Sequence, residues 1–181
     1  NMGGCGGQCA GAIAYAGVQV SPPTPVGPGL VVYLPHTVIN TGNSKDTFKL
    51  TSTYSGPWVP VSITYYKDNG VVGVYEPGTD TLLTDTNGDA APDTGPVTMG
   101  ASFNLLVAVV TPGPPAYGTV NVVTTFTSGF VAGCGAGSPT STSVTDPVKI
   151  PAADLRTTKT DGRVTAVPGT SISYTIQVTN A

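Results

Sequence analysis

Apolar and polar residues alternate along most of this 181-residue chain, and Gly, Pro, Asn or Asp interrupts the alternation at short intervals. Such alternation places successive side chains on opposite faces of a strand, and short alternating runs between turn residues are typical of a β-sandwich or barrel. No stretch has the 3.6-residue period of a helix, so the pattern predicts an all-β fold. The expected strands are residues 12–20, 30–40, 46–54, 58–66, 101–111 and 117–127, a shorter one at 143–150, and a terminal pair at 153–160 and 170–179.

The run from Pro28 to Asn40 is repeated in plan near the C-terminus, from Pro168 to Asn180. A Pro-Gly pair opens each copy, and in each copy the Gly and the closing Asn are eleven residues apart. Because the period-two register is kept, the same face is apolar in both copies. The inward face carries Val32, Leu34, His36 and Val38 in the first copy, and Ile172, Tyr174, Ile176 and Val178 in the second. We interpret the chain as one complete sandwich followed by the opening strands of a second.

Several motifs of the chain occur together in one known type of repeat. They are the Asn-Thr-Gly-Asn turn at 40–43, the Asp-Thr-Phe strand at 46–48, the strand that begins at Trp58, the acidic loop that ends at Asp93, and the Leu-Leu-Val strand at 105–107. In these motifs the sequence resembles the Ig-like conserved repeats of large bacterial surface proteins over residues 16–128, and residues 153–181 resemble the start of the next repeat. The resemblance implies an Ig-like antiparallel β-sandwich with a C-terminal β-strand extension, used as a spacer, stalk or adhesin module. The short second copy and the cysteines depart from the pattern of the family.

Composition divides the chain into four predicted parts. These are a Gly-rich segment at 1–11, the sandwich at 12–128, a Gly/Ser/Thr/Pro linker at 129–152, and candidate donor strands at 153–181. The linker is rich in Ser and Thr at 138–145, which would suit O-linked sugars.

Charge and hydropathy exclude two classes of partner. The net charge is -3 and the seven Lys and Arg are scattered, so no basic stripe for nucleic acid exists. The longest apolar run, at 105–110, is far too short to span a membrane.

Three cysteines, Cys5, Cys9 and Cys134, lie in Gly-rich surroundings. Exposed free thiols are uncommon in oxidising compartments, which favours one disulfide and an extracellular or cell-surface location. Either Cys5 or Cys9 could pair with Cys134 and fasten the N-terminal segment, or Cys5 could pair with Cys9. In each case one cysteine is left over.

Six of the ten acidic residues fall between Asp68 and Asp93. Asp85, Asn87, Asp89 and Asp93 place oxygen side chains at alternate positions, as in loops that coil around Ca²⁺. Clustered carboxylates with no nearby cation except Lys67 also favour a bound ion. We therefore predict calcium here; the alternative is a solvated hairpin loop, because Asp, Asn and Gly all favour turns.

A second candidate metal site has less regular spacing. Its residues are Asp68, Asn69, Glu76 and Asp80. Val71 and Val72 interrupt the pattern, and some of these carboxylates could instead join the first site.

No residues suggest catalysis, so we expect no enzyme. His36 is the only histidine, and as a strand residue it is expected to be buried and hydrogen-bonded. There is no Gly-x-Ser-x-Gly elbow, no phosphate-binding loop, and no carboxylate pair outside the predicted calcium loop.

Two functions of different classes remain. The first is a structural subunit that joins copies of itself head to tail in a surface filament, with Ile172, Tyr174, Ile176 and Val178 completing a sheet of the next subunit. The strand expected at 12–20 is the alternative donor, or it forms the acceptor edge. The second is an adhesin or carbohydrate-binding module, for which some of the eight tyrosines could form a glycan platform.

Overall fold

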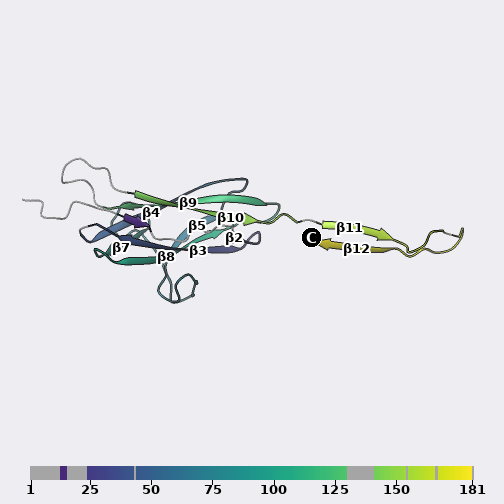
Figure 1. Ribbon diagram of the computed structural model, residues 1–181, viewed down its shortest axis with the longest axis horizontal. Helices are drawn as coiled ribbons and strands as arrows, with labels where there is room; N and C mark the ends of the chain where they lie inside the picture. Colours follow the sequence, from purple (N-terminus) through teal and green to yellow (C-terminus); the bar gives the residue numbers. More distant parts are fainter. Residues whose placement is uncertain are drawn as a thin grey trace, which may run out of the picture. The chain divides into compact units, whose positions relative to one another are not determined.

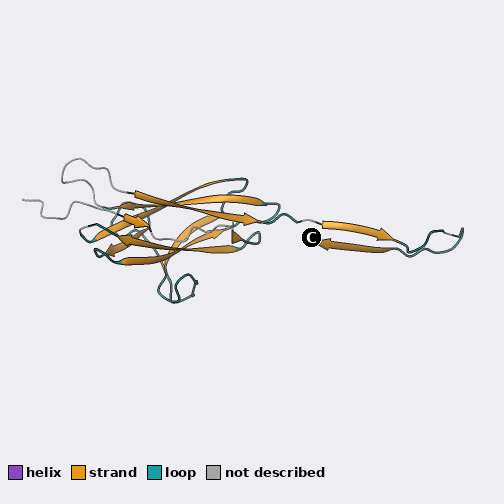
Figure 2. Ribbon diagram, viewed as in Figure 1, coloured by secondary structure: helices purple, strands orange, loops and turns teal. Residues whose placement is uncertain are grey.

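The computed structural model describes residues 13–15, 24–42, 44–129, 141–153, 155–165 and 167–180. Every regular element in these residues is a β-strand, which confirms the all-β prediction (Figure 2). No helix in this part of the chain is long and apolar enough to cross a membrane. Cys5, Cys9 and Cys134 lie outside the described residues, so the disulfide stays a prediction.

Ten strands form two five-stranded sheets that make up an Ig-like sandwich (Figure 1). The first sheet has the order β1 (Ile13–Tyr15), β3 (Val31–Asn40), β8 (Ser102–Val110), β5 (Ser62–Lys67), β6 (Thr81–Leu82). The second has the order β2 (Thr24–Pro25), β10 (Ser141–Ile150), β9 (Gly118–Ser128), β4 (Asp46–Ser55), β7 (Asp93–Val97). All neighbours are antiparallel except β2 and β10, which are parallel.

The core lies between these two sheets. Alternate residues of β3 and β4 are buried, and β8 is buried on both faces over residues 105–109, as expected for a central strand. The largest fully buried side chains include Leu34 and Leu105 from the first sheet and Phe48, Leu50 and Phe126 from the second. The alternating pattern of the sequence is therefore the inside-outside pattern of the sandwich.

The predicted linker at 129–152 is wrong from residue 141 onward, although the short strand expected at 143–150 is present as part of a longer one. Residues Ser141–Ile150 form β10, which pairs with β9 along all ten of its residues. Val144, Asp146, Val148 and Ile150 of this strand are all buried. The sandwich thus extends to Ile150 rather than to residue 128. Asp146 interrupts the apolar face of β10 in the sequence, but the strand still belongs to the second sheet and its inward side chains are buried.

The last part of the chain, Pro151–Ala181, is a separate compact unit. It contains a two-stranded antiparallel hairpin, β11 (Leu155–Thr160) with β12 (Thr175–Asn180). Leu155 lies opposite Asn180 and Thr160 lies opposite Thr175. The terminal strand pair expected from the sequence is confirmed, although β12 is shorter than the predicted strand at 170–179.

Candidate functional site

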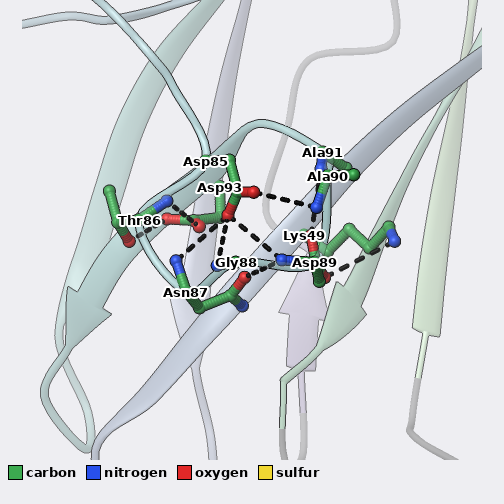
Figure 3. A network of polar contacts seen from close by, with 9 residues as sticks. All are labelled: Lys49, Asp85, Thr86, Asn87, Gly88, Asp89, Ala90, Ala91 and Asp93. Atoms are coloured by element: carbon green, nitrogen blue, oxygen red, sulfur yellow. Dashed lines mark hydrogen bonds and ion pairs between the residues drawn. The ribbon is translucent and has the colours of Figure 1, made fainter.

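The acidic loop that connects β6 to β7 holds a network of polar contacts, and Asp85 lies at its centre (Figure 3). Asp85 Oδ1 accepts hydrogen bonds from the backbone amides of Asn87, Gly88 and Asp89 at 3.1, 2.6 and 3.3 Å. Its Oδ2 accepts from the amide of Ala90 at 2.8 Å. The loop therefore curls around this one carboxylate.

These bonds affect both the charge and the backbone of the loop. The Gly88 amide, followed by the Ala90 amide, lowers the pKa of Asp85 below its usual value of 3.8. Ala90 has a φ of 65°, which is uncommon for a residue with a side chain and turns its amide toward Asp85. The sequence thus forms a fixed, negatively charged turn.

Asn87 and Asp89 continue the same arrangement. Asn87 Oδ1 accepts from the Asp89 amide at 3.2 Å, and Asp89 Oδ1 accepts from the Ala91 amide at 3.1 Å. Asp89 Oδ2 lies 3.4 Å from Nζ of Lys49 on β4 (Figure 3). Asp85, Asn87 and Asp89 are all exposed, so a cation could reach their outer lone pairs.

Asp93 belongs to a different environment from the other three predicted ligands. It is fully buried at the start of β7. Its Oδ2 accepts from the Thr86 amide at 2.7 Å, and its Oδ1 accepts from the Thr86 hydroxyl at 2.6 Å and the Gly95 amide at 2.7 Å. Three donors therefore hold Asp93 as a structural anchor of the loop.

This geometry does not fit the four-ligand shell expected from the sequence. In the described part of the chain, no three Asp, Glu, His or Cys side chains come together as a group that could hold a metal ion. A calcium ion at this loop would have to use Asp85, Asn87 and Asp89 without Asp93, and binding there stays a prediction.

The second predicted group is brought together in the loop after β5. Asp80 Oδ1 accepts from the Asn69 amide at 2.9 Å, and its Oδ2 accepts from the Glu76 amide at 2.8 Å. These bonds, that of Glu76 first, lower the pKa of Asp80. Asp68 Oδ2 accepts from the Gly73 amide at 2.7 Å, and Glu76 Oε2 accepts from the Val71 amide at 2.7 Å. The acidic groups close the loop on itself through its own amides.

The four residues predicted as an assembly strand lie in the hairpin and the segment leading into it. Tyr174, Ile176 and Val178 are 53%, 61% and 59% exposed. Ile172 precedes β12 and is partly buried. The ammonium group of Lys159 on β11 lies 4.0 Å from the centre of the Tyr174 ring. The apolar face exists as predicted, and the Lys159 side chain lies across it at Tyr174.

One pair of residues was missed by sequence reasoning. His36 of β3 and Asp146 of β10 face each other across the core, with Nε2 and Oδ2 3.1 Å apart and both side chains fully buried. The His36 ring also makes an edge contact with Phe126, with centroids 6.5 Å apart. The burial of His36 is confirmed. Its carboxylate partner could not be predicted, because the short strand expected at 143–150 was placed in the linker rather than in a sheet of the sandwich.

The tyrosines show two different arrangements. Tyr33, Tyr66 and Tyr75 pack on one another, and the rings of Tyr33 and Tyr75 stack at 4.2 Å with an interplanar angle of 8°. Tyr117 is 63% exposed and lines a groove of about 550 Å³ at one end of the sandwich. The other lining residues of this groove are Pro57, Trp58, Val59, Pro112, Gly113, Pro115, Ala116 and Gly118.

No protein-family model and no curated protein matches the sequence. Solved structures match the chain distantly, among them the following two. A PapD-like domain of human CEP192 is 13% identical, with a TM-score of 0.45, over 78% of this chain and 87% of that domain. The α-2-macroglobulin of E. coli is 14% identical, with a TM-score of 0.46, over 82% of this chain but only 7% of that much longer protein. At this level of similarity the comparisons add nothing about function, and the Ig-like β-sandwich is established by the two sheets themselves.

Proposed function

We propose that this chain is an extracellular structural protein, a subunit of a pilus-like surface filament joined head to tail by β-strands of residues 153–181. The observation that carries the proposal is the exposed apolar face of the hairpin. Tyr174, Ile176 and Val178 repeat the pattern of β3, whose equivalent residues are buried in the sandwich.

The hairpin needs a partner for physical reasons. A lone two-stranded hairpin is marginally stable in water, and roughly thirty residues are too few to form a core. A strand that pairs with the sheet edge of another subunit satisfies its backbone and buries its apolar face together. A head-to-tail contact that does not close on itself produces a filament.

Calcium is the proposed stabilising ion, held by the exposed oxygens of Asp85, Asn87 and Asp89. The alternating positions of these residues and the depressed pKa of Asp85 support this assignment, because a carboxylate that stays ionised suits a hard cation. The resemblance to repeats of bacterial surface proteins supports a cell-surface location.

The purified chain tests the proposal by electron microscopy. We expect regular filaments from the full chain and none from a truncation after Ala152. The truncated protein should remain folded, since all core residues precede position 151. Filaments of the same form from the truncated protein would contradict the proposal.

A binding module is the second candidate, and the groove beside Tyr117 is the observation that favours it. An apolar groove with an exposed aromatic ring suits the face of a sugar or a Pro-rich segment. A glycan array probed with the native chain and with Tyr117→Ala measures this. Binding that is lost in the variant supports the module, whereas an unreactive array rejects glycan binding.

A further inference from the structure

One long side of the sandwich is only half covered by strands. On this side β7 pairs with the beginning of β4, at Asp46–Lys49, and β6 pairs with the end of β5, at Tyr66 and Lys67. No described strand pairs on this side with residues 51–55 of β4 or with residues 59–64, which lead into and begin β5. We call these two stretches the open side. Tyr65 connects them, because its hydroxyl donates to Ser52 Oγ at 2.8 Å.

The backbone of the open side is available for pairing. The Leu50 amide donates to Pro92 O on the outer side of β4, and alternate residues of a strand direct their amides and carbonyls to the same side. Ser52 and Tyr54 therefore direct theirs outward, where no described strand meets them. On β5 the Tyr65 carbonyl accepts from the Leu83 amide, so Ile63 faces outward in the same way.

The side chains of the open side are unusually apolar for a sheet edge. Tyr54, Val59 and Val61 are 46%, 60% and 68% exposed, and residues 51–66 contain no charged residue. Edge strands normally carry charges that prevent pairing with other chains. The groove beside Tyr117 shares Val59 with this surface and extends its apolar area.

The other described edges are less suitable for strand addition. β3 and β10 also have outer edges without a described partner, at 31–37 and 141–147, but each of these stretches includes a Pro, which has no amide to donate. β7 contains Pro96, which has no amide, and Gly95 with a φ of 63°. β6 and β2 have two residues each, and β2 includes Pro25. The open side thus includes five residues of β4 without a Pro, although Pro60 interrupts the stretch that leads into β5.

We propose that the open side is the acceptor for β12 of a second copy of this chain. β12 has six residues and its edge opposite β11 has no described partner, so its length matches the five residues of β4 that are open. Strand addition beside β4 places Tyr174, Ile176 and Val178 over the exposed valines at 59 and 61. This inference rests on the proposed filament and adds to it the surface at which subunits meet.

Charge complementarity supports the same occupant. Residues 151–181 hold Arg156, Lys159 and Arg163 against two Asp and have a net charge of +1, whereas residues 1–150 have a net charge of -4. Six of the acidic residues lie in the loops at 68–93, which adjoin β6 and β7 on the same side of the sandwich as the open side. A basic hairpin that docks beside these loops is attracted by them, and copies are steered head to tail.

Two single substitutions block the two halves of the proposed contact. Val61→Lys places a charge on the acceptor, and Ile176→Asp places one on the donor; both positions are highly exposed, so both variants should fold. Val72→Lys and Val167→Asp are matched controls, since these residues are 64% and 67% exposed but lie off the proposed contact. If Val61→Lys fails to fold, Val59→Lys replaces it.

The readout is the mass of the particles by light scattering and sedimentation. We expect the native chain and both controls to assemble, and each blocked variant alone to lose assembly. An equimolar mixture of the two blocked variants should form dimers, because the intact hairpin of one fits the intact open side of the other.

The failures are distinguishable. If Ile176→Asp is monomeric while Val61→Lys and Val59→Lys still assemble, the hairpin donates to another edge: this inference is wrong and the proposed filament stands. If Ile176→Asp assembles like the native chain, or the native chain is monomeric, both proposals are wrong. If the native chain assembles but the blocked variants stay monomeric when mixed, residues 61 and 176 do not lie on complementary halves of one contact, which also overturns the inference.

Discussion

β3 and β12 follow one sequence plan and have opposite surroundings. Each is preceded by a Pro-Gly turn in which the Gly has a positive φ, 75° at Gly29 and 83° at Gly169. Five residues after that Gly, Leu34 is 1% exposed and Tyr174 is 53% exposed. Nine residues after it, the exposed fraction is zero for Val38 and 59% for Val178.

The difference lies in what covers each strand. β3 is paired with β8 over residues 31–39, and the second sheet covers its inner face. Among the described strands β12 pairs only with β11, although their register repeats that of β3 with β1: Asn40 lies opposite Ile13, and Asn180 lies opposite Leu155. An alternating pattern therefore specifies a strand and its apolar face, but burial depends on the neighbouring sheets.

Cutting the chain at the boundary between the two regions has the largest expected effect. We expect residues 1–150 to unfold cooperatively on heating and residues 151–181, as a peptide, to give the NMR spectrum of an unfolded chain. The reason is that the described residues of this unit form one two-stranded sheet, without a second layer of their own to bury its apolar face. A dispersed spectrum from the peptide would contradict the comparison.

Truncation of equivalent side chains compares the two regions directly. Leu34→Ala should lower the free energy of unfolding of the sandwich by about 4 kcal/mol, because it removes a fully buried side chain from a dense core. Tyr174→Ala should change it by less than about 0.5 kcal/mol. Urea denaturation of the full chain measures both. Equal losses would mean that the hairpin is part of the core.

The seventh residue after the Gly is chemically different in the two copies. It is His36 in β3, paired with Asp146, and Ile176 in β12. Asp146→Val should cost about 3 kcal/mol, because it removes a buried carboxylate from the imidazole. Adding His36→Ile should restore most of the loss, since Ile is the residue that the second copy has here. Denaturation of the single and double variants checks this, and a double variant no more stable than the single would reject it.

Sequence patterns located the long strands to within one residue at most ends. The predicted runs 30–40, 46–54, 101–111 and 117–127 are β3, β4, β8 and β9, since each alternates or is continuously apolar between clear turn signals. Trp58 to Val61 were expected in a strand but precede β5, where Pro60 prevents regular pairing.

The elements that the sequence did not predict depend on tertiary contacts. β7 contains Gly95 and Pro96, which disfavour a strand, and it exists because β4 offers an edge at Asp46–Lys49. In the acidic loop the spacing gave the turn at Asp85 correctly. It could not show that Asp93 turns inward to Thr86, because that direction follows from the start of β7.

Added calcium has the smallest expected effect on stability. It distinguishes the Asp85 loop of the sandwich from the turn at Asp161 in the hairpin. The turn at Asp161 in the hairpin also accepts a backbone amide, from Arg163 at 3.1 Å, but it lacks the alternating oxygens of the Asp85 loop. We therefore expect excess Ca²⁺ to raise the melting temperature of the sandwich by about 4 °C over EDTA, by binding only the folded state.

Asn87→Ala should abolish this shift and leave the melting temperature in EDTA nearly unchanged, because Asn87 contributes one loop hydrogen bond. Asp161→Asn is the control and should retain the full shift.

The pKa of Asp85 is lowered from 3.8, so its contribution to stability is complete above pH 3.8 and is lost as the pH falls through the lower folded value. The calcium shift should accordingly be as large at pH 5 as at pH 7. Identical melting curves in Ca²⁺ and EDTA would show that the backbone amides alone hold this loop.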